Sequence, residues 1–194
     1  MPNTNIDIDI LFDGVFNKLS SPEFGKNLGG ELPLFIQPIP AELQLHVDSQ
    51  IERLSTRLRK KGLESVSINL YDLCMDILQE ECVLDTLLEE EASLDKDDIV
   101  STLDSVLDIK SVLIPRIKET ILNASPAFAF INGVGNVYPF VRSHGILNNI
   151  DELTDNCNLV LFFPGEYDNL QLKLFGNISD ENYYRGHNLN DIDE

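Results

Sequence analysis

Long apolar runs and paired cysteines are both missing from this sequence. No run of about 18 apolar residues occurs, and the N-terminal residues form neither a basic nor an apolar segment, so we expect neither membrane insertion nor secretion. Cys74, Cys82 and Cys157 make an odd number without CxxC spacing. Two of the three lie in apolar runs, where a free cysteine acts as a small hydrophobic side chain. These absences favour a cytoplasmic protein.

Histidine is scarce, and its positions lack the spacing of a metal site. His46, His144 and His187 form neither HxxxH nor a Cys/His pair at ligand spacing. Ser143 next to His144 suggests a nucleophile with its base, and Glu166 suggests the third member of a triad. Adjacent residues on a helix point roughly 100° apart, however, so the serine lies out of hydrogen-bond reach of the histidine. We predict no catalytic residues and no metal site.

Motifs that bind nucleotide phosphates are incomplete. The P-loop pattern GxxxxGK[ST] is absent, and the nearest approach, Gly25-Lys26-Asn27, lacks the hydroxyl and precedes an expected strand. Gly133-Val134-Gly135 matches only part of GxGxxG, because Tyr138 stands at the sixth position. We therefore interpret this second motif as a tight turn after a strand, and we predict no cofactor.

Basic residues are few, 14 against 33 acidic ones, which gives a net charge of −19. A nucleic-acid backbone is repelled by such a charge, so we expect DNA contact only indirectly, through partners. Nine acids and one base lie between Glu80 and Asp98. This segment could also mimic DNA. The bases of 53–61 either complement a helix dipole or form a docking patch for an acidic partner.

What the chain does have is the composition of a folded domain, with 43% hydrophobic and 24% charged residues over a length of 194. Helical spacing of apolar residues alternates with short apolar runs typical of strands. Helices are expected at 6–19, 43–62, 72–78, 84–122 and 143–153, and strands at 32–36, 66–70, 128–131, 158–163 and 170–174. This pattern predicts an α/β protein in which a mostly parallel central sheet of four to six strands is flanked by helices, in P-loop-NTPase-like layers without Walker motifs.

The expected organisation is a single domain spanning 1–194. Residues 1–30 form an N-terminal helix and loop, 84–123 a helical excursion broken at 94–95 and 108–111, and 188–194 a frayed acidic tail. Pro38 and Pro40 close the first strand. Gly62 ends the second helix, and Asp72 caps the start of the third.

Turn residues follow four of the expected strands, at 37–40, 69–72, 132–135 and 164–167. In a parallel sheet these strand ends share one edge, where ligands bind in open α/β folds. Arg142 could pair with Glu166 or Asp72 and pin two loops, or it could bind an anion or a partner. The candidate partner- or ligand-binding residues of this edge are Tyr71, Asp72, Gly133, Gly135, Tyr138, Arg142, His144, Glu166 and Tyr167.

Several blocks of the sequence, in a fixed order, are those of a known family. They are LFIQPIPAE at 34–42, NLYDL at 69–73, GVG at 133–135, YPFVRSH at 138–144, ILNN at 146–149, LFFPGEY at 161–167 and NYYR at 182–185. From about residue 32 to residue 189 the chain resembles the BrxB family of bacterial BREX (bacteriophage exclusion) systems.

The resemblance implies a role in anti-phage defence, alongside a methyltransferase, a large ATPase and the alkaline-phosphatase-like protein PglZ. It supplies no catalytic residues to carry over. We therefore expect a non-catalytic subunit that binds other BREX proteins, PglZ first and the methyltransferase or ATPase otherwise, and helps assemble the defence complex. The alternative is a nucleotide- or anion-sensing or enzymatic α/β protein with a pocket at the carboxyl ends of the strands.

Overall fold

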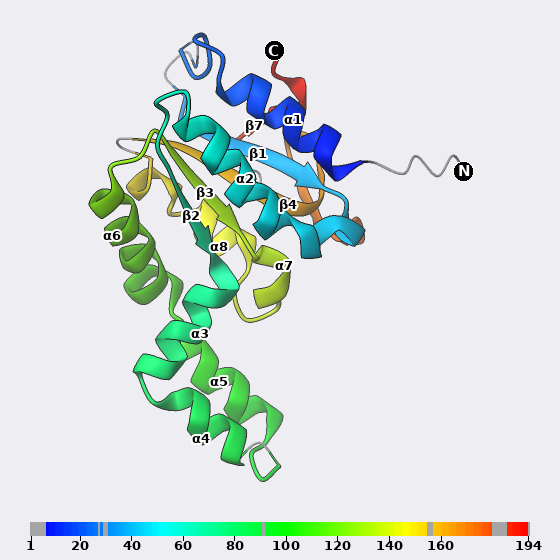
Figure 1. Cartoon of the computed structure of the whole chain (residues 1–194). Coiled ribbons are helices and arrows are strands. Elements are labelled where there is room, and N and C mark those ends of the chain that lie inside the picture. Colours follow the sequence, from blue (N-terminus) through cyan, green and yellow to red (C-terminus); the bar gives the residue numbers. More distant parts are fainter. Residues whose placement is uncertain are drawn as a thin grey trace.

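A parallel sheet forms the centre of the protein in the computed structural model, which describes residues 7–26, 28, 31–90, 92–154, 157–179 and 186–193 (Figure 1). Its strands are β1 (Leu34–Ile39), β2 (Ser65–Asn69), β3 (Phe128–Asn132), β4 (Asn158–Tyr167) and β7 (His187–Asn188). They lie in the order β2-β3-β4-β1-β7, and every neighbouring pair is parallel. Two short strands, β5 (Leu172–Leu174) and β6 (Ile178–Ser179), continue from the end of β4 as an antiparallel hairpin. The expected mostly parallel sheet is confirmed.

Helices cover both faces of this sheet. On one face α1 (Ile8–Leu19) packs beside α2 (Val47–Arg59), which follows a 3₁₀ turn, η1 (Ala41–His46). The elements on the other face are α3 (Leu70–Glu80), the π-helical turn η2 (Ile109–Leu113), α6 (Ile114–Ala124), α7 (Val134–Val137), α8 (Ser143–Leu147) and the 3₁₀ turn η3 (Ile150–Glu152). A last 3₁₀ turn, η4 (Leu189–Asp191), follows β7. The expected layering of helix, sheet and helix is confirmed.

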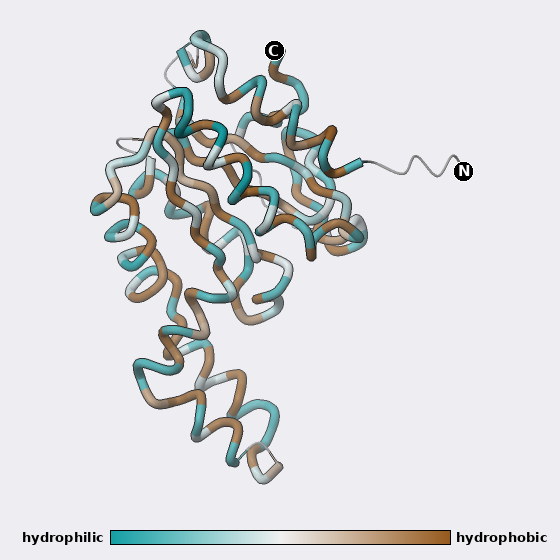
Figure 2. Tube along the Cα trace, viewed as in Figure 1, coloured by the Kyte–Doolittle hydropathy of each residue, from teal (hydrophilic) through white to brown (hydrophobic). Residues whose placement is uncertain are grey.

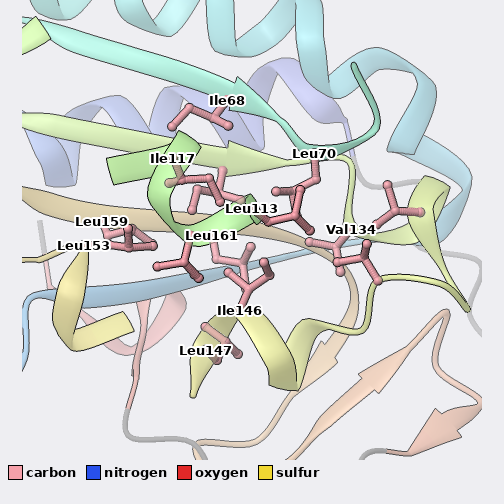
Figure 3. Close-up of a cluster of buried hydrophobic side chains, with 14 of the residues drawn as sticks. Ile68, Leu70, Leu113, Ile117, Val134, Ile146, Leu147, Leu153, Leu159 and Leu161 are labelled. Atoms are coloured by element: carbon pink, nitrogen blue, oxygen red, sulfur yellow. The ribbon is translucent and has the colours of Figure 1, made fainter. Parts of the chain in front are cut away.

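Two hydrophobic cores lie on the two faces because successive strand residues point to opposite sides. Phe128 and Phe130 of β3 join the core under α1 and α2, whereas Ala129 and Ile131 join the other one. The second core is aliphatic where Figure 3 shows it, with Leu113 of η2 among its labelled side chains. Burial of both sides explains why β3 and most of β4 read as apolar runs in the sequence, whereas β2 is largely half-exposed and contains two serines.

Helices α4 (Val83–Glu90) and α5 (Lys96–Val106) project away from the sheet (Figure 1). We call them the projecting pair. They belong to the helical excursion expected at 84–123. The helices are interrupted close to both expected places, between α4 and α5 and between α5 and η2. At the second interruption Asp108 Oδ1 accepts hydrogen bonds from Ser111 N at 2.8 Å and from Ser111 Oγ at 2.6 Å. Pro115 lies in the first turn of α6, directly after the π-helical turn η2.

Several element boundaries differ from the sequence prediction. The long helix expected from residue 43 is wrong as one piece, because the chain leaves Pro40 in the 3₁₀ turn η1 before α2 begins. The helix expected at 143–153 is likewise two shorter pieces, α8 and η3. Asn69, not Asp72, caps α3, since its side-chain oxygen accepts from the N–H groups of Tyr71 and Asp72.

The first strand runs through Pro38 instead of stopping before it. Pro38 pairs with Phe163 of β4, while β7 pairs only with Phe35 and Ile36 in the part of the chain that the structure describes. The side of β1 beyond Ile36 is therefore an edge, where a residue without an N–H removes no ladder bond.

The predicted turn at Pro164-Gly165-Glu166 is wrong, because these residues lie inside β4. Pro164 pairs with Ile39 of β1, and Gly165 and Glu166 pair with β5. Gly165 has φ +154°, and a Cβ there would collide with the backbone oxygen of Lys173. Glycine at this position lets the strand run on into the hairpin.

The frayed tail expected at 188–194 is also wrong. Asn188 pairs with β1, and the side chain of Leu189 is fully buried. Lys18 Nζ donates to the backbone oxygen of Leu189 at 2.8 Å, which ties the tail to α1. Other predicted positions, namely Ile6, Gly29, Gly30, the block at 182–185 and Glu194, lie outside the described residues. No helix of the described chain has both the length and the apolar character needed to cross a membrane.

Candidate functional site

The carboxyl ends of β1 to β4 meet at one edge of the sheet, as the parallel pairing requires. Helix α2 follows β1 onto one face, and α7 follows β3 onto the other. The place where successive helices turn to opposite faces is the usual ligand position in an open α/β sheet. We call it the strand-end crevice.

Side chains of the protein itself fill the strand-end crevice. Asp48 Oδ1 accepts hydrogen bonds from Asn69 Nδ2 at 3.0 Å and from Asn132 Nδ2, and Gln44 Nε2 donates to Asn136 Oδ1. The cavity left among them measures about 20 Å³, enough for about one water molecule. Asn132 is 3% exposed, and its Oδ1 has no hydrogen-bond partner among the described residues, so a water placed there would satisfy it.

Gly133 and Gly135 allow this close approach. Gly133 has φ +77°, and a Cβ on it would collide with the side-chain oxygen of Asn69. A Cβ on Gly135 would lie 2.7 Å from Gln44 Oε1. Both glycines therefore leave room for the side chains that fill the crevice, which fits the interpretation of the motif as a turn.

A larger hollow, of about 350 Å³, lies between α8 and the β5–β6 hairpin. We call it the hairpin hollow. Tyr138, Arg142 and His144 of the predicted set line it together with Ser143. Its remaining lining residues, which are apolar apart from the last, are Val134, Val141, Phe163, Leu172, Leu174, Ile178 and Ser179. Sequence reasoning missed the hairpin side chains, because the alternation of Leu170, Leu172 and Leu174 indicates a strand but not which helix it faces.

Arg142 is exposed and lies at the start of α8. Neither predicted partner lies within ion-pair distance of it. Glu166 Oε2 lies instead 3.9 Å from Lys173 Nζ, and Asp72 lies in the first turn of α3. Among the arginines that the structure describes, only Arg142 has no described carboxylate within ion-pair distance. The paired ones are Arg53 with Asp9, Arg57 with Asp13, Arg59 with Glu64 and Arg116 with Glu80.

The other predicted residues lie away from the hairpin hollow. Tyr71 and Asp72 are exposed on the first turn of α3, and Glu166 is exposed on β4. Tyr167 is 6% exposed, and its hydroxyl donates to the backbone oxygen of Gly186 at 2.8 Å. Its contact is therefore internal to the fold.

Potential nucleophiles and metal ligands show little convergence. Burial raises the pKa of Cys74 to about 11 and also raises the pKa of Cys157, so both thiols stay protonated at neutral pH. Across the described ranges, no three His, Cys, Asp or Glu side chains gather in a way that could hold a metal ion.

The model of the family described as "BREX protein BrxB" matches residues 66–189, from β2 to η4. The chain belongs to the BrxB family. It is similar to the BREX protein BrxB of Bacillus cereus (strain H3081.97), with 33% identity over 190 residues, which covers 95% of this chain and 98% of that protein. It is also similar to the BREX protein BrxB of Escherichia coli O9:H4 (strain HS), with 25% identity over 175 residues, 89% of this chain and 86% of that protein. No solved structure matches the chain.

The BrxB family match includes the projecting pair, the hairpin hollow and most of the strand-end crevice. The resemblance expected from the sequence blocks is thereby confirmed. The similarity to the Bacillus cereus BrxB protein extends over the full fold, because it covers nearly all of both chains.

Proposed function

We propose that this protein is a non-catalytic, cytoplasmic subunit of a BREX anti-phage defence system that binds other BREX proteins and helps assemble the defence complex. Membership in the BrxB family supports the BREX role, since both relatives are named BREX proteins. The alkaline-phosphatase-like PglZ is the first partner to test, followed by the methyltransferase and the ATPase.

The projecting pair is the observation that carries the proposal. No side chain of α4 is fully buried, and α5 fully buries only Leu103. Other apolar side chains of the pair are only partly buried against the core, namely Val83, Leu84, Leu87, Ile99 and Val106. Hydrophilic and hydrophobic residues both occur along these helices (Figure 2), and Leu88 is 65% exposed. Ordering these helices costs conformational entropy, and the small area that they bury offsets only part of that cost. Docking on another protein would bury the remaining surface.

The charge of the projecting pair indicates the kind of surface it would meet. Six acids and one base lie on α4 and α5, and the whole chain carries a charge of −19. Such a surface attracts a basic protein patch and repels the phosphate backbone of DNA. We therefore infer that the protein reaches DNA only through its partners.

The strand-end crevice supports a binding role over nucleotide chemistry. Asp48, Asn69 and Asn132 occupy the position where a nucleotide would lie in an open α/β sheet, and the space left holds about one water molecule. A nucleotide could enter only if this hydrogen-bonded group came apart. The nucleotide-sensing alternative thus has less support than the subunit role.

Co-purification tests the proposal. The tagged protein is recovered from cells that express the whole defence operon, and its partners are identified by mass spectrometry at physiological salt. One variant reverses charge on α4, Asp85→Lys with Glu89→Lys, and a matched control reverses two exposed acids elsewhere, Glu119→Lys with Asp151→Lys.

We expect stoichiometric recovery of PglZ or another BREX protein with the parent and the control, and its loss with the α4 variant. Recovery of the tagged protein alone would contradict the subunit role. Full recovery of partners with the α4 variant would remove the projecting pair as the docking element.

A further inference from the structure

The hairpin hollow is separate from the strand-end crevice, with which it shares no lining residue. Its walls include Phe163, which is 1% exposed, and Leu172, which is fully buried. Tyr138, Ser143 and Arg142 supply polar groups. An apolar interior with a few polar groups is the usual composition of a small-molecule site.

Arg142 provides one positive charge beside this hollow, and no described carboxylate neutralises it, although the chain has 33 acidic residues. It also borders a more open hollow of about 480 Å³ that Asp104 lines, yet that carboxylate is not within ion-pair distance. Arginine favours carboxylates because its planar group donates two parallel hydrogen bonds to them.

We propose that the hairpin hollow binds a small carboxylic acid with one apolar or aromatic group, its carboxylate on Arg142 and its apolar part against Phe163 and the hairpin leucines. The volume of about 350 Å³ is at the small end of ligand sites, which suits one ring system with a short acidic arm. A single guanidinium matches a single negative charge, and the net charge of −19 disfavours dianions such as phosphate esters. This inference goes beyond the proposed function and does not depend on it.

The absence of tryptophan from the sequence gives the proposal a clean assay. Indole-3-acetate is the probe, because its own fluorescence can be excited without a contribution from protein tryptophan. Fluorescence anisotropy of the probe is followed while the purified full-length protein is added at physiological salt. Indole-3-acetamide, which has the same ring and no charge, is the matched control. We expect saturable binding of the acid, and binding of the amide at least about fivefold weaker.

Arg142→Gln tests the charged contact while keeping a polar side chain. Because the guanidinium is exposed, the pair is screened by water, and we expect binding of the acid to weaken by about fivefold and binding of the amide to stay unchanged. The control is Lys61→Gln, which removes one exposed positive charge just beyond the end of α2.

A second pair of variants tests the rim without touching Arg142. Ile178 lines the hollow and is 37% exposed, so polar replacements are tolerated by the fold. Ile178→Glu should weaken binding of the acid by a further several-fold relative to Ile178→Gln, since the two differ only in charge. Equal affinities of acid and amide, or identical binding by parent, Arg142→Gln and Ile178→Glu, would overturn the proposal.

The same chemistry could come from a free acid or from the carboxyl terminus of a partner protein. A short peptide that ends in tryptophan with a free carboxylate is compared with indole-3-acetate and with the same peptide carrying a terminal amide. Tighter binding of the free-carboxylate peptide than of indole-3-acetate would identify a protein terminus as the source. Equal or weaker binding of that peptide would identify a free acid. Binding of neither indole-3-acetate nor the free-carboxylate peptide would refute the site.

Discussion

Replacing Asp48 with alanine tests whether the closed strand-end crevice stabilises the fold. Asp48 accepts hydrogen bonds from the side-chain amides of Asn69 and Asn132. Asn132 is 3% exposed, so its freed N–H group would stay buried without a partner, which costs about 1–3 kcal/mol. Asn69 is partly exposed and can bond to water instead. We expect Asp48→Ala to lower the free energy of unfolding by about 2 kcal/mol.

Two companion variants separate this reason from a general effect of mutation. Asp48→Asn keeps a side-chain oxygen that can accept both hydrogen bonds and removes only the charge, so its loss should be about 1 kcal/mol or less. In Asp48→Ala with Asn132→Val no buried amide is left unpaired, so the double variant should be more stable than the sum of the two single losses predicts.

Urea unfolding followed by circular dichroism gives the free energies, with unchanged slopes as the check on two-state behaviour. Equal losses for Asp48→Ala and Asp48→Asn would refute the reasoning, and so would strict additivity in the double variant. Either result would mean that water satisfies Asn132 and that the crevice is more open than its cavity of about 20 Å³ indicates.

Three further predictions concern thiols, the carboxyl-terminal segment and acid stability. In the folded protein a thiol reagent should label the exposed Cys82 much faster than the buried Cys74 and Cys157. Burial raises the pKa of Cys74 to about 11 and also raises the pKa of Cys157, so both thiols are unreactive as well as covered. Equal labelling rates for all three cysteines would contradict the burial. Leu189→Ala should lower the free energy of unfolding in urea by about 2–4 kcal/mol, because the side chain is fully buried; a loss under about 0.5 kcal/mol would mean that the tail frays after all. Hydrogen bonds from two backbone N–H groups lower the pKa of Asp168 from 3.8, so its contribution to stability is present above that pH and is lost as the pH falls through the lower folded-state pKa. Asp168→Asn should therefore flatten the acid side of a stability-against-pH curve below about pH 4, and an unchanged curve would argue against this cause.

The sequence predicts the sheet well, for a physical reason. Strands buried on both faces read as apolar runs, so Phe128–Asn132 could be found within one residue. Boundaries are less predictable where a turn residue serves inside a strand. Pro38 and Gly165 read as turn signals, yet both lie inside strands. Pro38 lies in β1 at its unpaired side, and Gly165 lies where β4 begins to pair with the hairpin strand β5. Neither role has a local signature, because each depends on which strand lies alongside.

The candidate site is predictable only in part for a related reason. Chain order shows that the strand ends share an edge, and it brings Tyr138, Arg142 and His144 together because they are close in sequence. The opposite wall of the hairpin hollow comes from a later hairpin, whose approach no spacing indicates. The closing of the strand-end crevice by Asp48 and Asn132 is equally non-local, since the two residues lie 84 positions apart.

Strands β2 and β3 pair along their whole length, from Ser65 with Phe128 to Asn69 with Asn132. The chain between them therefore leaves the sheet at the carboxyl end of β2, after Asn69, and crosses back to the opposite edge to enter β3 at Phe128, beside Ser65. Because both anchor points are fixed by that pairing, the outer part of the excursion can lengthen, shorten or change its charge without moving any strand, at a loop-closure cost that grows only slowly with length. In the docking role proposed for the projecting pair, partner choice and scaffold stability could thus change independently, because new side chains on α4 and α5 would leave the strand pairing as it is.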